Sequence, residues 1–206
     1  EQHELILRDG MYESKQLPNI IETKNSVFRP VEVRGGPDGA IYVADWYNPI
    51  IGHYQASYRH PDRDKAHGRI WRVTSKDRPL VRKADLITKS VTELLEQLDS
   101  PERWAQYQVK RLLFEKNTSE LSEALDIWVS KNTDNDYRRL QALSVFEAHE
   151  LPRLKLLKEL LLVADPRIRA YATRALSTWA RSDAIPEALA LIERQIHDAD
   201  PIVRLE

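Results

Sequence analysis

The chain has 206 residues, of which 42% are hydrophobic and 31% are charged, and its formal net charge is −1. This composition is typical of a folded protein with a core, and it gives no net charge that would favour nucleic acid or an acidic membrane surface as a partner. The absence of cysteine excludes disulfides, thiol catalysis, cysteine-ligated zinc and covalent haem attachment within this chain. No apolar run approaches the roughly 20 residues that a helix needs to cross a bilayer, so we expect no membrane span.

Residues 1–10 form a charged, strand-like segment and do not resemble a signal peptide. Both ends look interrupted, because the first residues enter a β pattern and residues 200–206 begin a further helix. We therefore expect the chain to be a fragment of a larger protein. The alternative is a complete small protein with a frayed end.

Three short strands are predicted between residues 28 and 73. Val31 and Val33 alternate with polar neighbours in the first, and Ile41, Val43 and Asp45 alternate with Tyr42 and Ala44 in the second. The third contains Ile70 and Val73. The sequence Gly-Gly-Pro-Asp-Gly at residues 35–39 predicts a tight turn between the first two strands, because glycine accepts positive φ and proline presets its own φ. A strand, a Pro-Asp-Gly turn, a strand, a long loop and a strand are typical of one blade of a β-propeller.

From Ser90 the hydrophobic period changes from 2 to 3.6 residues, which predicts helices for the rest of the chain. Ser90 and Glu93 have the spacing of a capping box. Further helix starts are predicted at Ser100-Pro101, Ser119, Asp136, Pro152, Asp165-Pro166, Pro186 and Asp200-Pro201. The predicted core of these helices includes Val91, Leu94, Leu95, Leu98, Ala105, Val109, Leu112, Leu113, Leu121, Leu125, Trp128, Leu140, Leu143, Phe146, Leu154, Leu157, Leu160 and Leu161.

The helix starts near residues 101, 136, 166 and 201 are separated by 35, 30 and 35 residues, which indicates a helical repeat. Segment 165–176 resembles a HEAT repeat, with Asp165 as the cap and Arg169 at the arginine position of that family. Residues 200–204 repeat its opening. The period is close to that of tetratricopeptide repeats, but their signature residues are missing, so we favour short HEAT-like pairs.

The predicted fold class is therefore α+β in two parts. A terminal β-propeller blade, or blades, of antiparallel strands occupies residues 1–78, and an ordered connector follows at 79–89. An α-α HEAT-like solenoid of about four helix pairs, the last one truncated, occupies residues 90–206.

Four motifs in the β part resemble a known family. They are Phe28-Arg29-Pro30-Val31, Gly36-Pro37-Asp38-Gly39, Tyr42-Val43-Ala44-Asp45-Trp46-Tyr47-Asn48-Pro49-Ile50-Ile51-Gly52-His53 and His67-Gly68-Arg69-Ile70-Trp71-Arg72-Val73. The stretch resembles the last blade of soluble quinoprotein (PQQ) sugar dehydrogenase-like propellers. It is most similar to the large membrane-bound dehydrogenase family of planctomycetes and verrucomicrobia, in which such a propeller precedes HEAT repeats and a haem-binding cytochrome c domain. The motifs cover about the first third of the chain, and beyond them the resemblance rests on domain order.

This resemblance implies that Arg29 lies near the carboxylates of PQQ, a role that suits the permanently charged, forked guanidinium. The alternative is an arginine that pairs with a neighbouring acid. PQQ and Ca²⁺ are implied only for the full-length protein, and we assign no catalytic residue and no metal ligand to this chain. The implied partners are the rest of the propeller and a downstream cytochrome c-like domain, and the implied location is periplasmic or secreted.

The loop at residues 45–68 is long for one blade, which makes it a functional candidate. Its polar residues are Asp45, Asn48, His53, His60, Asp62, Asp64 and His67. A structural loop is favoured over a metal site, because histidines spaced seven residues apart match no known ligand pattern. We assign Trp46, His53 and His67 as candidate contacts for a sugar or alcohol substrate. Trp46, Tyr47, Tyr54, Tyr58 and Trp71 could stack on a sugar ring, but we favour a place in the blade core or at the seam to the next domain.

Two functions from different classes remain open. The first is a part of a sugar or alcohol dehydrogenase, in which the helical repeats act as a scaffold toward an electron-accepting haem domain. The second is a non-catalytic propeller and HEAT module that binds a protein or a glycan. The chain has no P-loop, no dinucleotide-binding glycine motif and no Ser-His-Asp pattern, so other common chemistries have no signature here.

Overall fold

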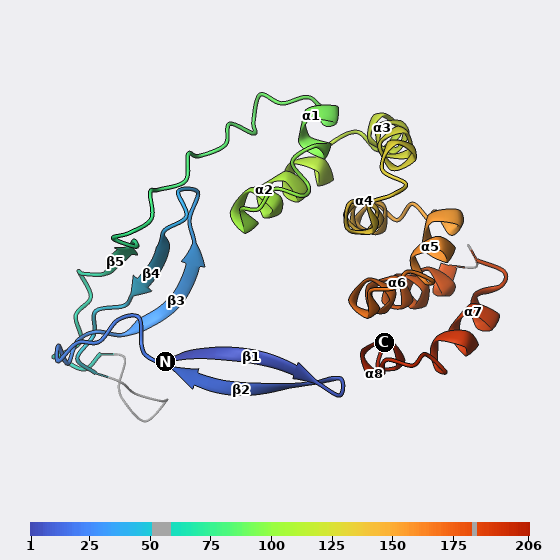
Figure 1. The fold of residues 1–206 in the computed structure, drawn as a ribbon. Coiled ribbons are helices and arrows are strands. Elements are labelled where there is room, and N and C mark those ends of the chain that lie inside the picture. Colours follow the sequence, from blue (N-terminus) through green and yellow to red (C-terminus); the bar gives the residue numbers. More distant parts are fainter. Residues whose placement is uncertain (51–58, 183–184) are drawn as a thin grey trace. The chain divides into compact units, whose positions relative to one another are not determined.

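The computed structural model describes residues 1–50, 59–182 and 185–206 (Figure 1). Within these ranges the chain forms five β-strands and eight α-helices. It divides into two compact units. The first comprises residues 1–2, 18–84 and 102–105, and the second comprises residues 3–17, 85–101 and 106–206.

The first two strands, β1 (Gln2–Arg8) and β2 (Met11–Leu17), form a two-stranded hairpin. Asp9 and Gly10 connect them, and both have positive φ, at 48° and 77°. A two-residue turn with positive φ at both positions matches the right-handed twist of its strands, and Asp-Gly is a favoured pair for it.

The second sheet contains β3 (Pro30–Gly35), β4 (Ile41–Asp45) and β5 (Arg69–Val73), in chain order and antiparallel throughout (Figure 1). Cross-strand partners share a face of a sheet. Val43 lies opposite Val33 on one side and Trp71 on the other, so this face is apolar. The opposite face carries the polar row of Arg34, Tyr42 and Arg72. The three predicted strands are confirmed, and no strand follows β5 in the described residues.

The turn between β3 and β4 holds the segment that follows β5. Asp38 caps its own turn by accepting a hydrogen bond from the Ala40 N–H at 3.1 Å. The carbonyl of Asp38 accepts a further bond from the Val81 N–H at 2.9 Å, and Arg78 Nη2 donates to the Gly39 carbonyl at 3.3 Å. Residues 78–81 therefore lie against the Pro-Asp-Gly turn.

We expect Gly39→Ala to destabilise the chain by about 1–2 kcal/mol, because an L-residue is strained at positive φ. Gly39 has a φ of 76°, and an added Cβ would lie 2.9 Å from Val81 Cγ2. Gly35→Ala is the matched control, since an added Cβ there meets nothing within 4 Å. Urea unfolding of both variants tests this, and equal midpoints for the two would contradict it.

The helices account for the rest of the chain. They are α1 (Val91–Leu95), α2 (Arg103–Phe114), α3 (Thr118–Lys131), α4 (Asp136–Ala148), α5 (Leu154–Leu160), α6 (Pro166–Trp179), α7 (Ala188–Gln195) and α8 (Pro201–Arg204), with the 3-10 turn η1 (Ala180–Ser182) after α6. The predicted capping box of Ser90 and Glu93 is present at α1. Asp165 and Asp200 cap α6 and α8, each before a proline in the first turn, as predicted.

Other helix starts differ from prediction by one or two residues. The first helical residue of α2 is Arg103, so Pro101 lies outside the helix. The cap of α3 is Asn117 and not Ser119, because the Asn117 side chain accepts from the N–H groups of both Ser119 and Glu120. These differences leave the predicted faces of the helices unchanged.

Leucine side chains form most of the core of the helical unit. The predicted core residues Leu94, Leu95, Leu98, Val109, Leu113, Leu121, Leu125, Leu143, Phe146, Leu157 and Leu160 are almost completely buried. Leu112, Leu140 and Leu154 are only partly buried. Contacts join α1 with α3, α4 with α6, and α6 with α8, so alternate helices pack on one another.

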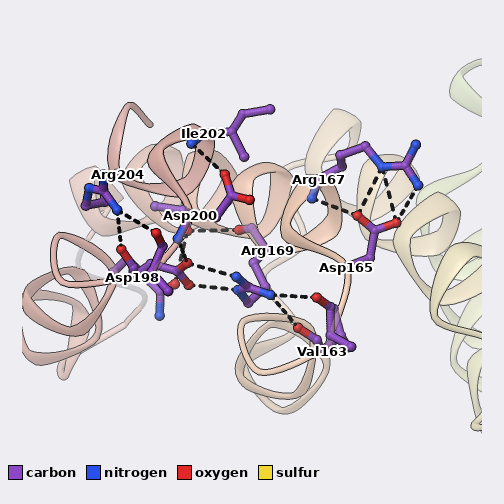
Figure 2. A network of polar contacts seen from close by, with 12 residues as sticks. Val163, Asp165, Arg167, Arg169, Asp198, Asp200, Ile202 and Arg204 are labelled. Atoms are coloured by element: carbon purple, nitrogen blue, oxygen red, sulfur yellow. Dashed lines mark hydrogen bonds and ion pairs between the residues drawn. The ribbon is translucent and has the colours of Figure 1, made fainter. Parts of the chain in front are cut away.

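A polar network joins the loop before α6 to the loop before α8 (Figure 2). Arg169 makes a two-pronged contact with Asp198, with Nε and Nη2 at 2.7 and 2.8 Å from the two carboxylate oxygens. Its Nη1 donates to the carbonyls of Val163 and Ala164, both at 2.9 Å. The hydrogen bonds from Arg169 hold the pKa of Asp198 below its ordinary value, although burial opposes them.

The same backbone contacts recur 35 residues later along the chain. Arg204 Nη1 donates to the carbonyls of Asp198 and Ala199, at 2.6 and 2.9 Å (Figure 2). Asp200 caps Ile202 as Asp165 caps Arg167. The sequence similarity of the two Asp-Pro segments therefore extends to their hydrogen bonds.

We expect Arg169→Ala to lower the free energy of unfolding by about 3 kcal/mol, because it leaves a largely buried carboxylate without its cation. The side chains of Arg169 and Asp198 are 16% and 12% exposed. Arg167→Ala is the control, since the Arg167 side chain is 76% exposed in its pair with Asp165. This substitution should lower the free energy of unfolding by at most about 1 kcal/mol. Similar losses in denaturant unfolding for the two variants would refute a special role for Arg169.

Candidate functional site

The carboxylate of Asp45, at the end of β4, is the centre of the polar structure in the first unit. Its side chain is fully buried. Oδ1 accepts from the N–H groups of Arg29 and Tyr47, at 2.7 and 3.0 Å. Oδ2 accepts from Arg69 Nε at 2.8 Å and from Trp71 Nε1 at 2.9 Å. Asp45 therefore fixes the start of β3, the exit from β4 and the first half of β5.

The register of the sheet explains why these partners meet. Asp45 lies opposite Pro30 in β3 and opposite Arg69 in β5, so its side chain reaches both edge strands. Burial by itself would raise the pKa of Asp45. The hydrogen bonds from Arg29, Trp71, Tyr47 and Arg69 outweigh this effect and lower the pKa to about 2. Asp45 is thus ionised at neutral pH and serves as a structural anion.

Aromatic rings surround the arginine that neutralises Asp45. The guanidinium of Arg69 lies 4.2 Å from the ring centroid of Tyr47 and 5.1 Å from that of Trp71. Tyr47 has a positive φ of 54°, which the hydrogen bond from its N–H to Asp45 holds in place. Trp46 is directed to a different cation, since the guanidinium of Arg63 lies 5.7 Å from its ring centroid. The indole of Trp46 remains 46% exposed.

Arg29, the predicted cofactor contact, is joined to Asp45 through its backbone and not through its side chain. Its guanidinium Nη1 donates to the carbonyl of Phe28 at 2.8 Å, and its buried Nε has no acceptor. The nearby acids have other partners, because Arg69 Nε binds Asp45 at 2.8 Å and Arg34 Nε binds Glu32 at 3.2 Å. In the described part of the chain, the Arg29 guanidinium is therefore without a carboxylate partner.

His67, a predicted substrate contact, is held by Asp64. Its Nδ1 lies 2.8 Å from Asp64 Oδ2, while its side chain is 71% exposed. Asp64 also accepts from the N–H groups of Ala66 and His67. The bond from the Ala66 N–H, followed by the bond from the His67 side chain, lowers the pKa of Asp64. The ring of His67 meets the ring of Tyr47 edge to face, with centroids 6.0 Å apart.

The structure brings together only some of the predicted site residues. His67 and Tyr47 lie beside the Arg69 stack, whereas Trp46 pairs with Arg63. His53, Tyr54 and Tyr58 lie outside the described residues. Among the residues that are described, no group of three metal-binding side chains comes together, and no helix is long and apolar enough to span a membrane.

Sequence reasoning missed the central role of Asp45 and the buried position of Asn48. Asn48 is 1% exposed, and its Nδ2 donates to the Asp64 carbonyl at 3.2 Å while its N–H donates to Val27. The available signal was an acid at the last position of an apolar strand, followed by an aromatic pair and an asparagine. Such residues stop a strand and satisfy its end, which is a structural role.

Comparison with known proteins adds one match. A family model described as a domain of unknown function (DUF7133) matches residues 2–77. No curated protein and no solved structure matches the chain. The match covers β1 to β5 and ends before the first helix.

We expect Asp45→Ala to destabilise the first unit by about 3 kcal/mol, because four donors lose a buried anion. Asp62→Ala is the control, since the Asp62 side chain is 71% exposed and its Oδ2 lies 3.9 Å from His60 Nδ1, which is beyond hydrogen-bond distance. Chemical denaturation of both variants measures the difference. A loss below about 1 kcal/mol for Asp45→Ala would contradict a central role.

The lowered pKa of Asp45 also predicts an acid dependence. The folded chain binds the Asp45 proton more weakly than the unfolded chain, whose ordinary value is 3.8. The contribution is therefore complete above pH 4 and is lost as the pH falls from about 4 to about 2. Asp45→Asn should flatten the dependence of the unfolding midpoint on pH in this window, and an unchanged profile would refute the assignment.

Proposed function

We propose that this chain is part of a quinoprotein-like sugar or alcohol dehydrogenase, in which Arg29 binds a carboxylate of the cofactor. The observation that carries the proposal is the unpaired guanidinium of Arg29. It is half-buried, and a cation in such a position is normally paired. Asp45, which accepts from the Arg29 N–H, is bound by Arg69, and Glu32 in β3 is paired with Arg34. Residues 51–58 contain no Asp or Glu that would pair with it.

The guanidinium of Arg29 suits one of the two groups that the resemblance implies, the quinone PQQ, and not the other, which is Ca²⁺. An arginine fork suits a quinone that carries carboxylates, such as PQQ. The hydrogen bond from the Arg29 N–H to Asp45 holds the backbone from which this side chain extends. The family resemblance implies Ca²⁺ only for the full-length protein, so we propose no ligand for it in this chain. When bound, the quinone supplies the two-electron acceptor for the oxidation.

The exposed apolar face of the sheet supports its role as a propeller blade. Val33 is 59% exposed and Trp71 is 41% exposed, although both lie beside the buried Val43. A hollow of about 200 Å³ lies over the same face, lined by Phe28, Pro30, Val33, Ile41 and Val43 among others. Three strands do not make an independent sandwich, and an apolar sheet face requires a second sheet to cover it. Neighbouring blades of a propeller would provide that cover.

The helical unit supports a HEAT-like scaffold. Alternate helices pack on one another, and the Asp-Pro caps with their arginines repeat at 35 residues. Helix pairs of this kind bury their apolar faces only by stacking. We propose that the stack positions the propeller relative to a downstream cytochrome c-like domain. From the family resemblance we also propose a periplasmic or secreted location.

In the proposed dehydrogenase, the substrate binds near His67. His67 binds Asp64 through Nδ1, which leaves its Nε2 to contact a substrate hydroxyl. Trp46, which is 46% exposed, offers a ring on which a sugar can stack. The same surface also supports the second candidate, a non-catalytic module that binds glycans, because aromatic stacking needs no cofactor. The two functions differ in whether they require the Arg29 side chain, because only the dehydrogenase needs it to bind the cofactor.

We expect Arg29→Ala to abolish dye-linked sugar or alcohol oxidation by the full-length protein supplied with PQQ and Ca²⁺. It should also weaken PQQ binding in calorimetry by at least about 30-fold, because a charged hydrogen-bonded pair is worth 2 kcal/mol or more. Arg29→Lys should recover only part of the affinity, since an ammonium lacks the fork. Arg34→Ala is the control, because the Arg34 side chain is 78% exposed and pairs with Glu32.

The outcome separates the two candidates. No oxidation across a broad panel of sugars and alcohols, together with no PQQ binding, would refute the dehydrogenase proposal. Glycan binding that is lost in Trp46→Ala but retained in Arg29→Ala would then establish the binding module. Oxidation that depends on Arg29 and is unaffected by Arg34→Ala supports the enzyme.

A further inference from the structure

Helix α2 leaves a stripe of large aromatic side chains exposed on its outer face. Tyr107 and Phe114 are each 61% exposed, whereas Val109 and Leu113 on the opposite face of the helix are completely buried. Residues seven positions apart lie on the same side of a helix, so the two rings form one line, roughly 10 Å long along the axis. Exposed aromatic rings that gather on one face are typical of a surface that binds a partner.

Helix α4 and the residue that caps it, His149, extend this surface and hold it in place. Tyr137 is 44% exposed, and its hydroxyl accepts a hydrogen bond from Gln106 Nε2 at 3.1 Å. At the other end, His149 Nε2 lies 3.1 Å from the carbonyl oxygen of Leu113, and its ring packs against that of Phe114, with centroids 5.6 Å apart. The stripe is therefore supported at both ends, and a surface that is ordered in advance loses little conformational entropy when it binds.

Two cations lie in the same stripe without an acidic partner. Lys110 is half-buried and follows Tyr107 by three residues, and burial lowers its pKa with no acid to oppose the effect. The guanidinium of Arg111 lies 5.9 Å from the ring centroid of Tyr107. Helix α2 contains no Asp or Glu, and the exposed Glu115 that follows it pairs with neither cation in the described part of the chain. A partly desolvated cation is costly unless an anion approaches it, so this face lacks a negative charge.

We propose that this face of α2 docks an acidic amphipathic helix of a partner protein. Apolar side chains of the partner would pack along Tyr107 and Phe114, and its carboxylates would pair with Lys110 and Arg111. A helix fits because a straight stripe two turns long offers ridges between which the side chains of a second helix pack. Tyrosine, phenylalanine and arginine are also the side chains in which protein–protein interfaces are enriched. This inference is independent of the proposed dehydrogenase function.

The charge of the stripe favours this partner over other occupants. A second copy of the chain would bring like cations together, which disfavours that contact. Attachment to an anionic membrane typically uses clusters of roughly four to eight Lys and Arg. Nucleic acid binding likewise rests on many phosphate contacts. Two cations in a chain of net charge −1 match neither, whereas carboxylates on one face of a single helix are enough to pair with them.

A labelled helical peptide of leucine and glutamate, with leucines at i, i+3, i+4 and i+7, tests the proposal by fluorescence anisotropy with the whole chain. The same peptide with lysine in place of glutamate is the negative probe. We expect the acidic peptide to bind at low salt, to bind more weakly as salt screens the charges, and the basic peptide not to bind. Because the net charge of the chain is −1, its overall field does not attract an acidic peptide, and binding must be local.

Variants of the stripe and of distant positions complete the test. The double variants K110Q/R111Q and Y107A/F114A should each weaken binding about tenfold, the first by removing the charge pairs and the second by removing the apolar contact. Lys155→Gln on α5 and Tyr12→Ala on β2 are the matched controls, since both side chains are exposed and lie outside the stripe, and they should leave the affinity unchanged.

Three results would overturn the proposal directly, namely no binding of the acidic peptide, equal binding of the basic peptide, or equal weakening by the control variants. Co-sedimentation with phosphatidylserine vesicles that is lost in K110Q/R111Q would also overturn it, by assigning the stripe to a membrane. A dimer in light scattering that dissociates in Y107A/F114A would do the same, by assigning the stripe to a second copy of the chain.

Discussion

The buried carboxylate of Asp45 is the interaction on which the first unit depends. A desolvated anion is costly unless its lone pairs are satisfied, and here two backbone N–H groups and two side-chain donors satisfy them. Since the donors come from the approach to β3, the exit from β4 and the strand β5, the sheet and the carboxylate require each other. The positive φ of Tyr47 and the placement of Arg69 between two rings follow from the same requirement.

The ion pair of Asp45 with Arg69 also bears on which carboxylates near Arg29 are already paired. Arg69 neutralises Asp45, and Arg34 pairs with Glu32, so neither acid is free to bind Arg29. The Arg29 guanidinium near the start of β3 is thus without a carboxylate partner among the described residues, and this is the basis on which we propose it as the cofactor contact.

In the helical unit, polar side chains stabilise the loops that connect the helices, and apolar side chains pack between the helices. Leucines fill the space between helices, whereas Asp165, Arg169 and Asp198 satisfy the backbone groups of the connecting loops (Figure 2).

The sequence by itself determined the features that depend on near neighbours. The turn at residues 35–39, the capping box at Ser90 and the Asp-Pro helix starts all use hydrogen bonds between residues at most a few positions apart, so residue type and spacing were sufficient. The motif around Arg29 also predicted a cofactor contact, and that role stays a prediction. Only the tertiary structure decided that Asp45 binds Arg29 and Trp71, which are 16 and 26 residues away, that Arg169 reaches Asp198 at a separation of 29, and that Glu96 meets Trp128 across 32. Such pairings depend on strand register and helix packing, and these arise from the burial of many apolar side chains together, so no local pattern encodes them.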